Sequence, residues 1–264
     1  MKKVKILSPL LAIILSLMLG CNTEQGQKER EGVAFENIES KAFPEVAVIG
    51  GVKKVIKEGE IEGRVALDTL NRENLYALGP VAKLQGEISI LNGEAHITDL
   101  TEDDEVIYHR HFDFQAAFLV YAHVKEWQKI PIEGEINQSN LPAIVAEHAA
   151  AIGIDTAEMA FPFLLSGPLD TARYHIIKKR GDFSQHNKAM HYDSKVKMEH
   201  QSPAVEILGF YSQNHEGIFT HHGSYVHAHL VDEPNKASGH LETFSSKSGM
   251  ALYLPKAKRG STNM

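Results

Sequence analysis

The alternation of hydrophobic and polar positions predicts a chain built mainly from antiparallel β-strands. The clearest case lies at residues 86–97, where apolar and polar residues alternate on either side of an Asn-Gly pair at 92–93. Asn-Gly favours the tight turn of a β-hairpin, because both turn positions need a positive φ. Side chains alternate between the two faces of a strand, so Ile88 and Ile90 share one face and Glu87 lies on the other.

Further strands are predicted where short apolar or alternating runs lie between polar segments. They cover residues 112–124, 161–165, 174–177, 205–211, 217–222, 225–231, 239–244 and 250–254. Residues 74–80 and the polar stretch 181–200 are expected to form loops. The sum is an α+β domain dominated by antiparallel sheet. A division into two β-rich lobes near residue 180 is an alternative arrangement.

Two short helices are also predicted. Apolar residues at helical spacing favour a helix over residues 46–56 that ends near Gly59. Asn140 is suited to cap a second helix that runs to about Ile152, and Pro142 is tolerated in its first turn.

The first 20 residues predict an export signal. A lysine-rich start is followed by an apolar run over residues 6–20, the order found in signal peptides. The segment Leu-Met-Leu-Gly-Cys at 17–21 resembles a bacterial lipobox, so Cys21 is predicted to become the lipidated amino terminus. The alternative is an uncleaved membrane anchor, for which the run is shorter than the ~20 apolar residues that a spanning helix needs.

The remaining chain divides into a tether and a domain. Residues 21–34 are polar and charged without apolar periodicity, which is typical of a flexible tether. The folded domain is then expected over residues 35–264. This order predicts a protein exported to the bacterial cell envelope, on the periplasmic or outer-membrane side, which contacts the membrane only through its lipid.

Composition restricts the chemistry that is available. The formal net charge is -7 and no basic stripe occurs, which argues against nucleic-acid binding because phosphates require clustered Lys and Arg. The single cysteine, Cys21, excludes an internal disulfide and leaves no thiolate ligand in the domain. With 15 histidines, a metal would be held by imidazoles and carboxylates.

A His-x-His motif carries the strongest chemical signal. His227 and His229 lie two residues apart on a predicted strand and therefore point to the same side. If the hairpin turns at residues 234–235, His229 lies opposite His240 and His227 lies opposite Glu242. Cross-strand neighbours are about 4.5–5.5 Å apart at Cβ, which suits three imidazoles that bind one ion at about 2.0–2.1 Å.

Three protein ligands leave one coordination position open, as in catalytic metal sites. Nitrogen ligands favour Zn²⁺, with Fe, Co, Ni or Mn as alternatives. The competing interpretation is that these are ordinary histidines on a solvated sheet face. His221 or His222 is close enough in sequence to face the same site, whereas the remaining candidates are expected at the surface: His109, His111, His186, His191 and His200.

Charged residues offer candidates for catalysis. Beside a cation, Glu87 would stay ionised and could accept or relay a proton, although the strand pattern alone favours a solvent-facing side chain. Arg173 and Lys178 could anchor an anion or form surface ion pairs.

Taken together, these segments resemble the acetolactate decarboxylase family. The similar pieces are His-x-His followed after ten residues by a third histidine, the Gly-Glu pair at 86–87, and the segments 75–93, 114–124, 207–222 and 225–241. The resemblance extends over about residues 45–256. It implies that His227, His229 and His240 bind zinc, and that 2-acetolactate loses CO₂ to give acetoin through a metal-stabilised enediolate. It also implies that Glu87 lies beside the metal.

Two positions depart from the family pattern. The family places an arginine for charge or proton delivery where this chain has His175, and Arg173 lies two residues earlier, so either residue is a candidate for that role. The family tail that returns a glutamate to the site has no carboxylate counterpart after Pro255.

These departures keep other functions open. One is a non-catalytic envelope lipoprotein that binds a metal or a metal-chelating metabolite, and another is a different metal-assisted lyase or hydrolase. The partner expected from the resemblance is a small 2-hydroxy-3-keto acid. An exposed sheet edge would also allow a homodimer.

Overall fold

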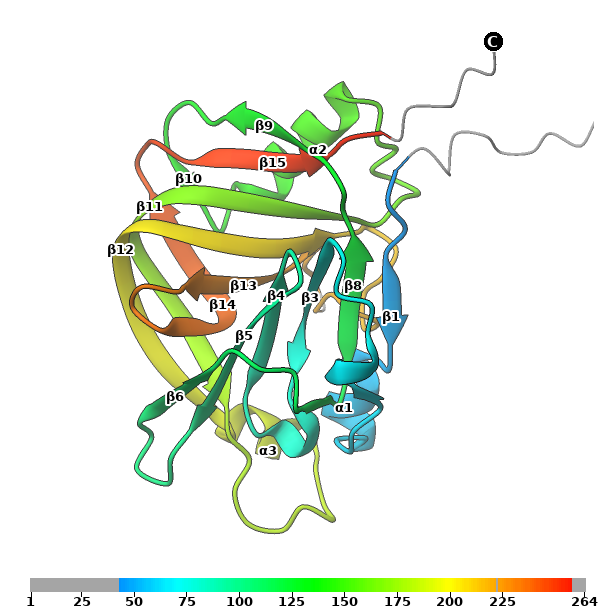
Figure 1. Ribbon diagram of the computed structural model, residues 1–264, viewed down its shortest axis with the longest axis vertical. Helices are drawn as coiled ribbons and strands as arrows, with labels where there is room; N and C mark the ends of the chain where they lie inside the picture. Colours follow the sequence, from blue (N-terminus) through cyan, green and yellow to red (C-terminus); the bar gives the residue numbers. More distant parts are fainter. Residues whose placement is uncertain (1–42, 222, 258–264) are drawn as a thin grey trace, which may run out of the picture. The chain divides into compact units, whose positions relative to one another are not determined.

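Two antiparallel sheets dominate this computed structural model, which describes residues 43–221 and 223–257 (Figure 1). The first sheet has six strands in the order β1-β8-β3-β4-β5-β6. In that order they are Ala47–Ile49, Leu119–His123, Leu75–Pro80, Glu87–Leu91, Glu94–Leu100 and Val106–His109. Two short strands, β2 (Val65–Ala66) and β7 (Gln115–Ala116), pair separately.

The second sheet has seven strands in the order β10-β14-β13-β12-β11-β15-β9. In that order they are Ile136–Asn137, Ala237–Ser246, Val226–Asp232, Lys195–Tyr211, Phe161–Ile177, Ala251–Pro255 and Trp127–Pro131. Strand β14 pairs with β11 as well as with β13, so β11, β12, β13 and β14 close into a ring. Figure 1 shows β11 and β12 as long, strongly bent strands.

The ring closes because β14 changes partner along its length. Its first residues pair with β13 as far as His240, and from His240 onwards it pairs with the second half of β11. The β14–β11 pairing shifts register where Leu241 and Thr243 lie opposite Tyr174 and Arg173, which leaves Glu242 as an extra residue in a β-bulge. The change of partner brings β11, β13 and β14 together at one point.

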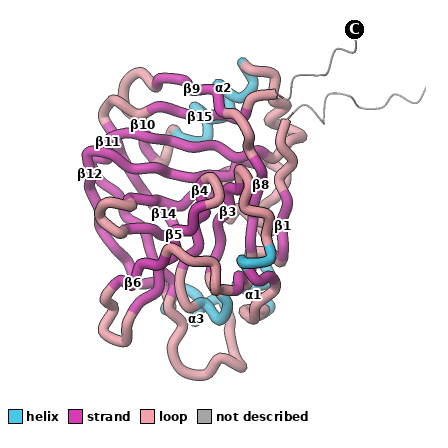
Figure 2. Tube along the Cα trace, in the orientation of Figure 1, coloured by secondary structure: helices cyan, strands magenta, loops and turns pink. Residues whose placement is uncertain are grey.

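Three short α-helices lie at the margins of the sheets, as Figure 2 shows in cyan. They are α1 (Val52–Glu58), α2 (Leu141–Ala151) and α3 (Lys188–Asp193), and two 3₁₀ turns cover Leu67–Thr69 and Ala82–Leu84. Helices α1 and α3 pack against each other. Within residues 43–221 and 223–257, no helix combines the length and hydrophobicity required to cross a membrane.

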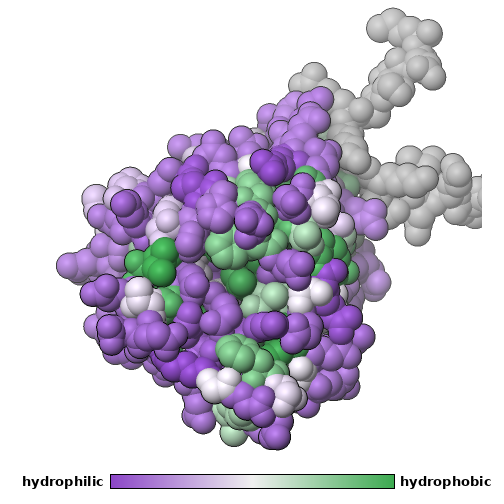
Figure 3. Space-filling view, turned by 60° about the horizontal axis from the view of Figure 1, so that its bottom comes forward, coloured by the Kyte–Doolittle hydropathy of each residue, from purple (hydrophilic) through white to green (hydrophobic). Residues whose placement is uncertain are grey.

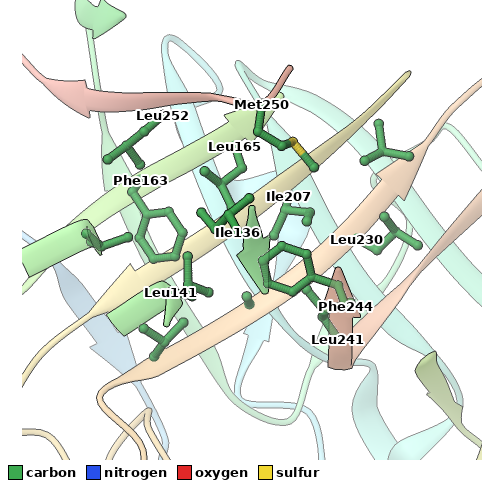
Figure 4. Close-up of a cluster of buried hydrophobic side chains, with 14 of the residues drawn as sticks. Ile136, Leu141, Phe163, Leu165, Ile207, Leu230, Leu241, Phe244, Met250 and Leu252 are labelled. Atoms are coloured by element: carbon green, nitrogen blue, oxygen red, sulfur yellow. The ribbon is translucent and has the colours of Figure 1, made fainter. Parts of the chain in front are cut away.

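Apolar side chains fill the space inside and between the sheets. Figure 4 shows a cluster in which Phe163 and Leu165 of β11, Ile207 of β12 and Leu230 of β13 pack with Leu141 of α2. A second cluster joins the two sheets, with Phe118 and Leu78 on one side and Leu208 and Phe210 on the other. The surface at the end turned forward in Figure 3 is mainly hydrophilic, with apolar residues in separate patches.

Several sequence predictions are confirmed. The class is α+β with mainly antiparallel sheet. Strands β4 and β5 form the predicted hairpin, and the turn residues Asn92 and Gly93 have φ values of 49° and 78°. Helix α2 occupies the predicted segment, and Gly59 ends α1 in a left-handed conformation with φ 73°.

Other predictions are wrong in part. The segment predicted as a loop at 74–80 contains strand β3 (Leu75–Pro80), and residues 217–219 form a turn rather than a strand. The segment 46–56 contains β1 before α1 begins at Val52, and 112–124 is divided into β7 and β8. Strand β3 is buried along most of its length, so its side chains do not show the alternation that identifies a half-buried strand.

The division near residue 180 is also wrong. Strands β11 and β12 lie on either side of it and pair from Phe161↔Tyr211 to Ile177↔Lys195. The boundary between the two sheets lies instead between β8 and β9. The predicted signal peptide, Cys21 and the tether at 21–34 lie outside the described residues.

We expect Gly239→Ala to disturb the junction of β14 with β11. A Cβ at Gly239 would lie 2.6 Å from Tyr174 Cδ2 and 2.7 Å from the His175 backbone oxygen, so the strands would have to separate. Overpacking of this kind costs about 1–3 kcal/mol, and the unfolding free energy in urea should fall by that amount. Gly51→Ala is the matched control, because its Cβ would meet no atom closer than 3.5 Å. Equal stability of both variants would contradict this account of the junction.

Candidate metal centre

Strand register places three histidines side by side on neighbouring strands. His240 of β14 pairs with His229 of β13, as the sequence predicts, and also with His175 of β11. His227 lies two residues from His229 on the same strand and points to the same side. The predicted pairing of His227 with Glu242 does not occur, because the β13–β14 ladder ends at His229 and His240.

The three predicted ligands, His227, His229 and His240, converge on one point. One ring nitrogen of each lies within 4.8 Å of the corresponding nitrogens of the other two. His227 Nε2 and His240 Nδ1 are 3.1 Å apart. Ligand nitrogens around a tetrahedral ion at 2.0–2.1 Å are separated by about 3.3 Å, so the observed spacing is close to that of a metal site.

An unpartnered nitrogen shows that these residues fit a metal ion. His229 Nε2 is buried and has no hydrogen-bond partner, which is costly unless something else satisfies it. Its other nitrogen, Nδ1, lies 3.1 Å from the Ser89 hydroxyl, which is itself 2.9 Å from the Ser238 hydroxyl. Such contacts fix the orientation of metal-binding imidazoles, so His229 Nε2 is free to bind a cation.

Burial keeps the three ligands neutral. It lowers the pKa of His229 to about 3, and lowers the pKa of His227 and His240 well below the usual value. Neighbouring histidines lower these values further. The unprotonated imidazole is the form that binds a metal, so the site requires no deprotonation at neutral pH.

Glu87 of β4 is the carboxylate nearest to these ligands. Its Oε2 is 3.8 Å from His229 Nε2 and its Oε1 is 3.8 Å from His175 Nε2. Only 3% of Glu87 is exposed, so the solvent-facing alternative is wrong: the polar face of the β4–β5 hairpin faces the second sheet. Burial raises the pKa of Glu87 well above its usual value, opposed by the charge of Lys195 and by a hydrogen bond from the Ile177 backbone.

His175 links Glu87 to a second carboxylate. Its Nδ1 lies 3.2 Å from Glu242 Oε1, and its ring centroid is 4.6 Å from that of His240. Burial lowers the pKa of His175 to about 4, whereas the interaction with His175 lowers the pKa of Glu242 to about 2. At neutral pH the pair is therefore a neutral imidazole beside an ionised carboxylate.

Arg173, the other candidate for this position, lies away from the cluster. Its side chain is 67% exposed and its Nε is 3.1 Å from Glu199 Oε1. The structure thus brings His175, and not Arg173, next to Glu87. Lys178 pairs with Asp99 at 3.0 Å and is buried, so it forms an ion pair as predicted, but not at the surface.

A cavity beside the histidines includes residues that the sequence analysis missed. His191 and Lys195 line it together with His221, and Val52 of α1 and Phe118, which precedes β8, are among its apolar lining residues. The prediction that His191 is solvated is wrong, because it is buried. His222 lies outside the described residues, so only His221 can be placed.

Two sequence signals could have identified these residues. The Asn187 side chain accepts hydrogen bonds from the Ala189 and Met190 backbones, which is the arrangement of a helix N-cap. After Lys195 the chain alternates between charged and less polar residues, as a strand does. The many polar residues of 181–200 concealed both signals.

Comparisons with known proteins agree with the fold. The family model of alpha-acetolactate decarboxylase matches residues 51–258. A solved alpha-acetolactate decarboxylase from Bacillus subtilis strain 168 is 13% identical, with a TM-score of 0.64 over 80% of this chain and 86% of its own. A Staphylococcus aureus protein described as similar to alpha-acetolactate decarboxylase is 14% identical, with a TM-score of 0.64 over 81% and 86%. A search of curated proteins finds no match.

We expect the metal-free protein to lose stability as the pH falls below about 6.5, the usual pKa of histidine. The unfolded chain binds protons there, whereas six buried or half-buried histidines do not until the pH is lower: His175, His191, His221, His227, His229 and His240. The free energy of unfolding therefore decreases. The raised pKa of Glu87 acts in the opposite direction, but it is one group against six.

The measurement is the thermal midpoint of chelator-treated protein at pH 7.5 and pH 5.5. A decrease of at least about 5 °C is expected. Zinc-loaded protein is the control and should change less, because the bound ion stabilises the folded state. A metal-free midpoint that is the same at both pH values would show that these histidines are not buried as neutral groups.

Proposed function

Because the chain belongs to the alpha-acetolactate decarboxylase family, we propose that it catalyses the metal-dependent decarboxylation of 2-acetolactate to acetoin and CO₂. The observation that carries the proposal is the convergence of three neutral histidines, His227 and His229 buried and His240 half-buried, next to the buried carboxylate of Glu87. Three nitrogen ligands leave an open position that a chelating substrate would occupy.

The metal that best suits the donor set is Zn²⁺, with other divalent transition metals as alternatives. His227, His229 and His240 would hold it. When bound, the ion would supply a Lewis acid that lowers the energy of the enediolate left by the departing CO₂. The chain shares the fold of the family, and the identity of the metal is part of our proposal.

Glu87 and His175 are the residues suited to proton delivery. Loss of CO₂ leaves a carbon that must gain one proton to give acetoin. Glu87 holds a proton more readily than an exposed glutamate because its pKa is raised by burial. His175 lies between Glu87 and the partly exposed Glu242, with 3.8 Å and 3.2 Å separations, so its imidazole could pass a replacement proton from solvent on the Glu242 side to Glu87.

The apolar wall of the cavity would serve the same reaction. Val52, Val55 and Ile56 of α1 and Phe118 are among the residues that line it. Such a wall accommodates the methyl groups of a branched acid and limits the access of water to the carbanion-like intermediate.

We also propose that the protein is an exported lipoprotein of the bacterial cell envelope, anchored through Cys21. The export-type pattern of residues 1–20 and the lipobox-like segment at 17–21 support this. A non-catalytic lipoprotein that binds a metal or a chelating metabolite is the second candidate function. It is favoured by one observation, the presence of His175 where the family has an arginine.

The proposed function predicts that zinc-loaded protein converts racemic 2-acetolactate into acetoin. His229→Ala should retain the fold but lose the activity by at least about 10³-fold, because one of three ligands is removed. His123→Ala is the matched control, since His123 is exposed on the first sheet. Protein that binds one zinc per chain and forms no acetoin would refute the decarboxylase and favour the second candidate.

A separate prediction concerns Glu87. Glu87→Gln keeps the size of the side chain but removes the transferable proton, so kcat should fall by about 10²–10⁴-fold, the usual contribution of a general acid. Zinc content should stay at the parental level. The measurement is steady-state kinetics with metal analysis of the same samples, and an unchanged kcat would eliminate Glu87 as the proton donor.

A further inference from the structure

The cavity beside the histidines contains one Lys or Arg side chain among its described lining residues, Lys195. It stands at the start of β12, paired with Ile177 at the end of β11. Its side chain is 11% exposed. An ammonium held this far from solvent is costly unless charged partners compensate for the lost hydration.

Glu242 provides that compensation. Lys195 Nζ lies 3.7 Å from Glu242 Oε1. Burial lowers the pKa of Lys195, and the Glu242 carboxylate opposes this effect. The ammonium is 5.2 Å from the centroid of the Tyr192 ring, a second favourable contact for a cation. These contacts fix the ammonium at the cavity.

The other basic groups at the cavity cannot supply a permanent positive charge at neutral pH. Burial, together with the charge of Lys195, lowers the pKa of His175 and His221 to about 4 and that of His191 to about 3. Arg173 is exposed and pairs with Glu199 outside the cavity. Lys195 is therefore the fixed cation of this part of the described chain.

We propose that Lys195 binds the carboxylate of the substrate. A 2-hydroxy acid that enters the cavity brings one negative charge, which needs a cation other than the ion that binds its hydroxyl and keto oxygens. The positive charge at the site would thus come from β12, because the neighbouring His175 of β11 is neutral. This inference rests on the proposed function in one respect only: it requires that the molecule bound in the cavity carries a carboxylate.

The chemistry of the reaction predicts a characteristic kinetic signature. The negative charge leaves the carboxylate as CO₂ forms and moves onto the substrate oxygens. The contact with Lys195 therefore stabilises the bound substrate more than the transition state. Loss of Lys195 should raise KM by at least about tenfold while kcat changes by less than about threefold.

The direct test uses 2-hydroxy-2-methylpropanoate, which has a carboxylate and a tertiary hydroxyl but no keto group and so cannot react. Calorimetric titration of zinc-loaded Lys195→Met should show at least about tenfold weaker binding than the parent, as expected for the loss of a charged hydrogen bond. Lys195→Arg should bind within about threefold of the parent. The uncharged amide of the same acid should bind the parent and Lys195→Met equally.

Lys197→Met is the matched control. Lys197 is the next residue on the same side of β12, but it is exposed and does not line the cavity, so its loss should leave binding unchanged. Lys195→Gln replaces Lys195→Met if the latter misfolds, and zinc content verifies each variant. Parental affinity for the anion in a zinc-loaded, folded Lys195→Met or Lys195→Gln variant would overturn the proposal.

The outcomes separate this proposal from the proposed function. If the anion binds through Lys195 but 2-acetolactate yields no acetoin, the decarboxylase is refuted and the anion site stands. If acetoin forms and the KM of Lys195→Met equals that of the parent, the decarboxylase stands and Lys195 is not the anchor.

Discussion

The pairing of β14 with two different strands is the constraint on which the site depends. At His240, β14 leaves β13 and continues along β11. His240 therefore has His229 on one side and His175 on the other. The close approach of Gly239 to the His175 backbone makes this exchange possible, because a Cβ there would lie 2.7 Å from the carbonyl oxygen. Without the exchange, β13 and β14 would form an ordinary hairpin, and neither His175 nor the bulged Glu242 would reach the ligands.

The protonation states at the site depend on burial, because the first sheet covers the junction of β11, β13 and β14. The polar face of the β4–β5 hairpin turns inward, so Ser89 contacts His229 and Glu87 lies beside it. Burial then acts on every titratable group in the same way: it favours the neutral form, lowering histidine pKa values and raising that of Glu87. Neutral imidazoles are ready for a cation, and a carboxyl group with a raised pKa is ready to hold a proton. Burial also lowers the pKa of Lys195, and the neighbouring Glu242 carboxylate opposes this effect.

Local signals in the sequence were sufficient for the ligands but not for their surroundings. The spacing of His227 and His229 and the turn before His240 define a hairpin, whose register depends only on neighbouring residues, and that register is confirmed. The position of His175 next to His240 joins segments that are 65 residues apart, which no local pattern encodes. The same holds for Glu87. It lies on the polar face of its hairpin, which the sequence pattern alone would place against solvent, and in the fold the second sheet covers that face. Lys195 was missed because a charged strand end and a charged loop have the same composition.

X-ray absorption at the zinc edge of the metal-loaded protein tests the central claim most directly. The account predicts nitrogen or oxygen ligands at about 2.0–2.1 Å, with outer-shell scattering that corresponds to three imidazoles and falls to two in His240→Ala. Scattering from fewer than three imidazoles in the parent protein, or a spectrum unchanged in His240→Ala, would contradict the claim that the β13–β14–β11 junction forms a three-histidine metal centre.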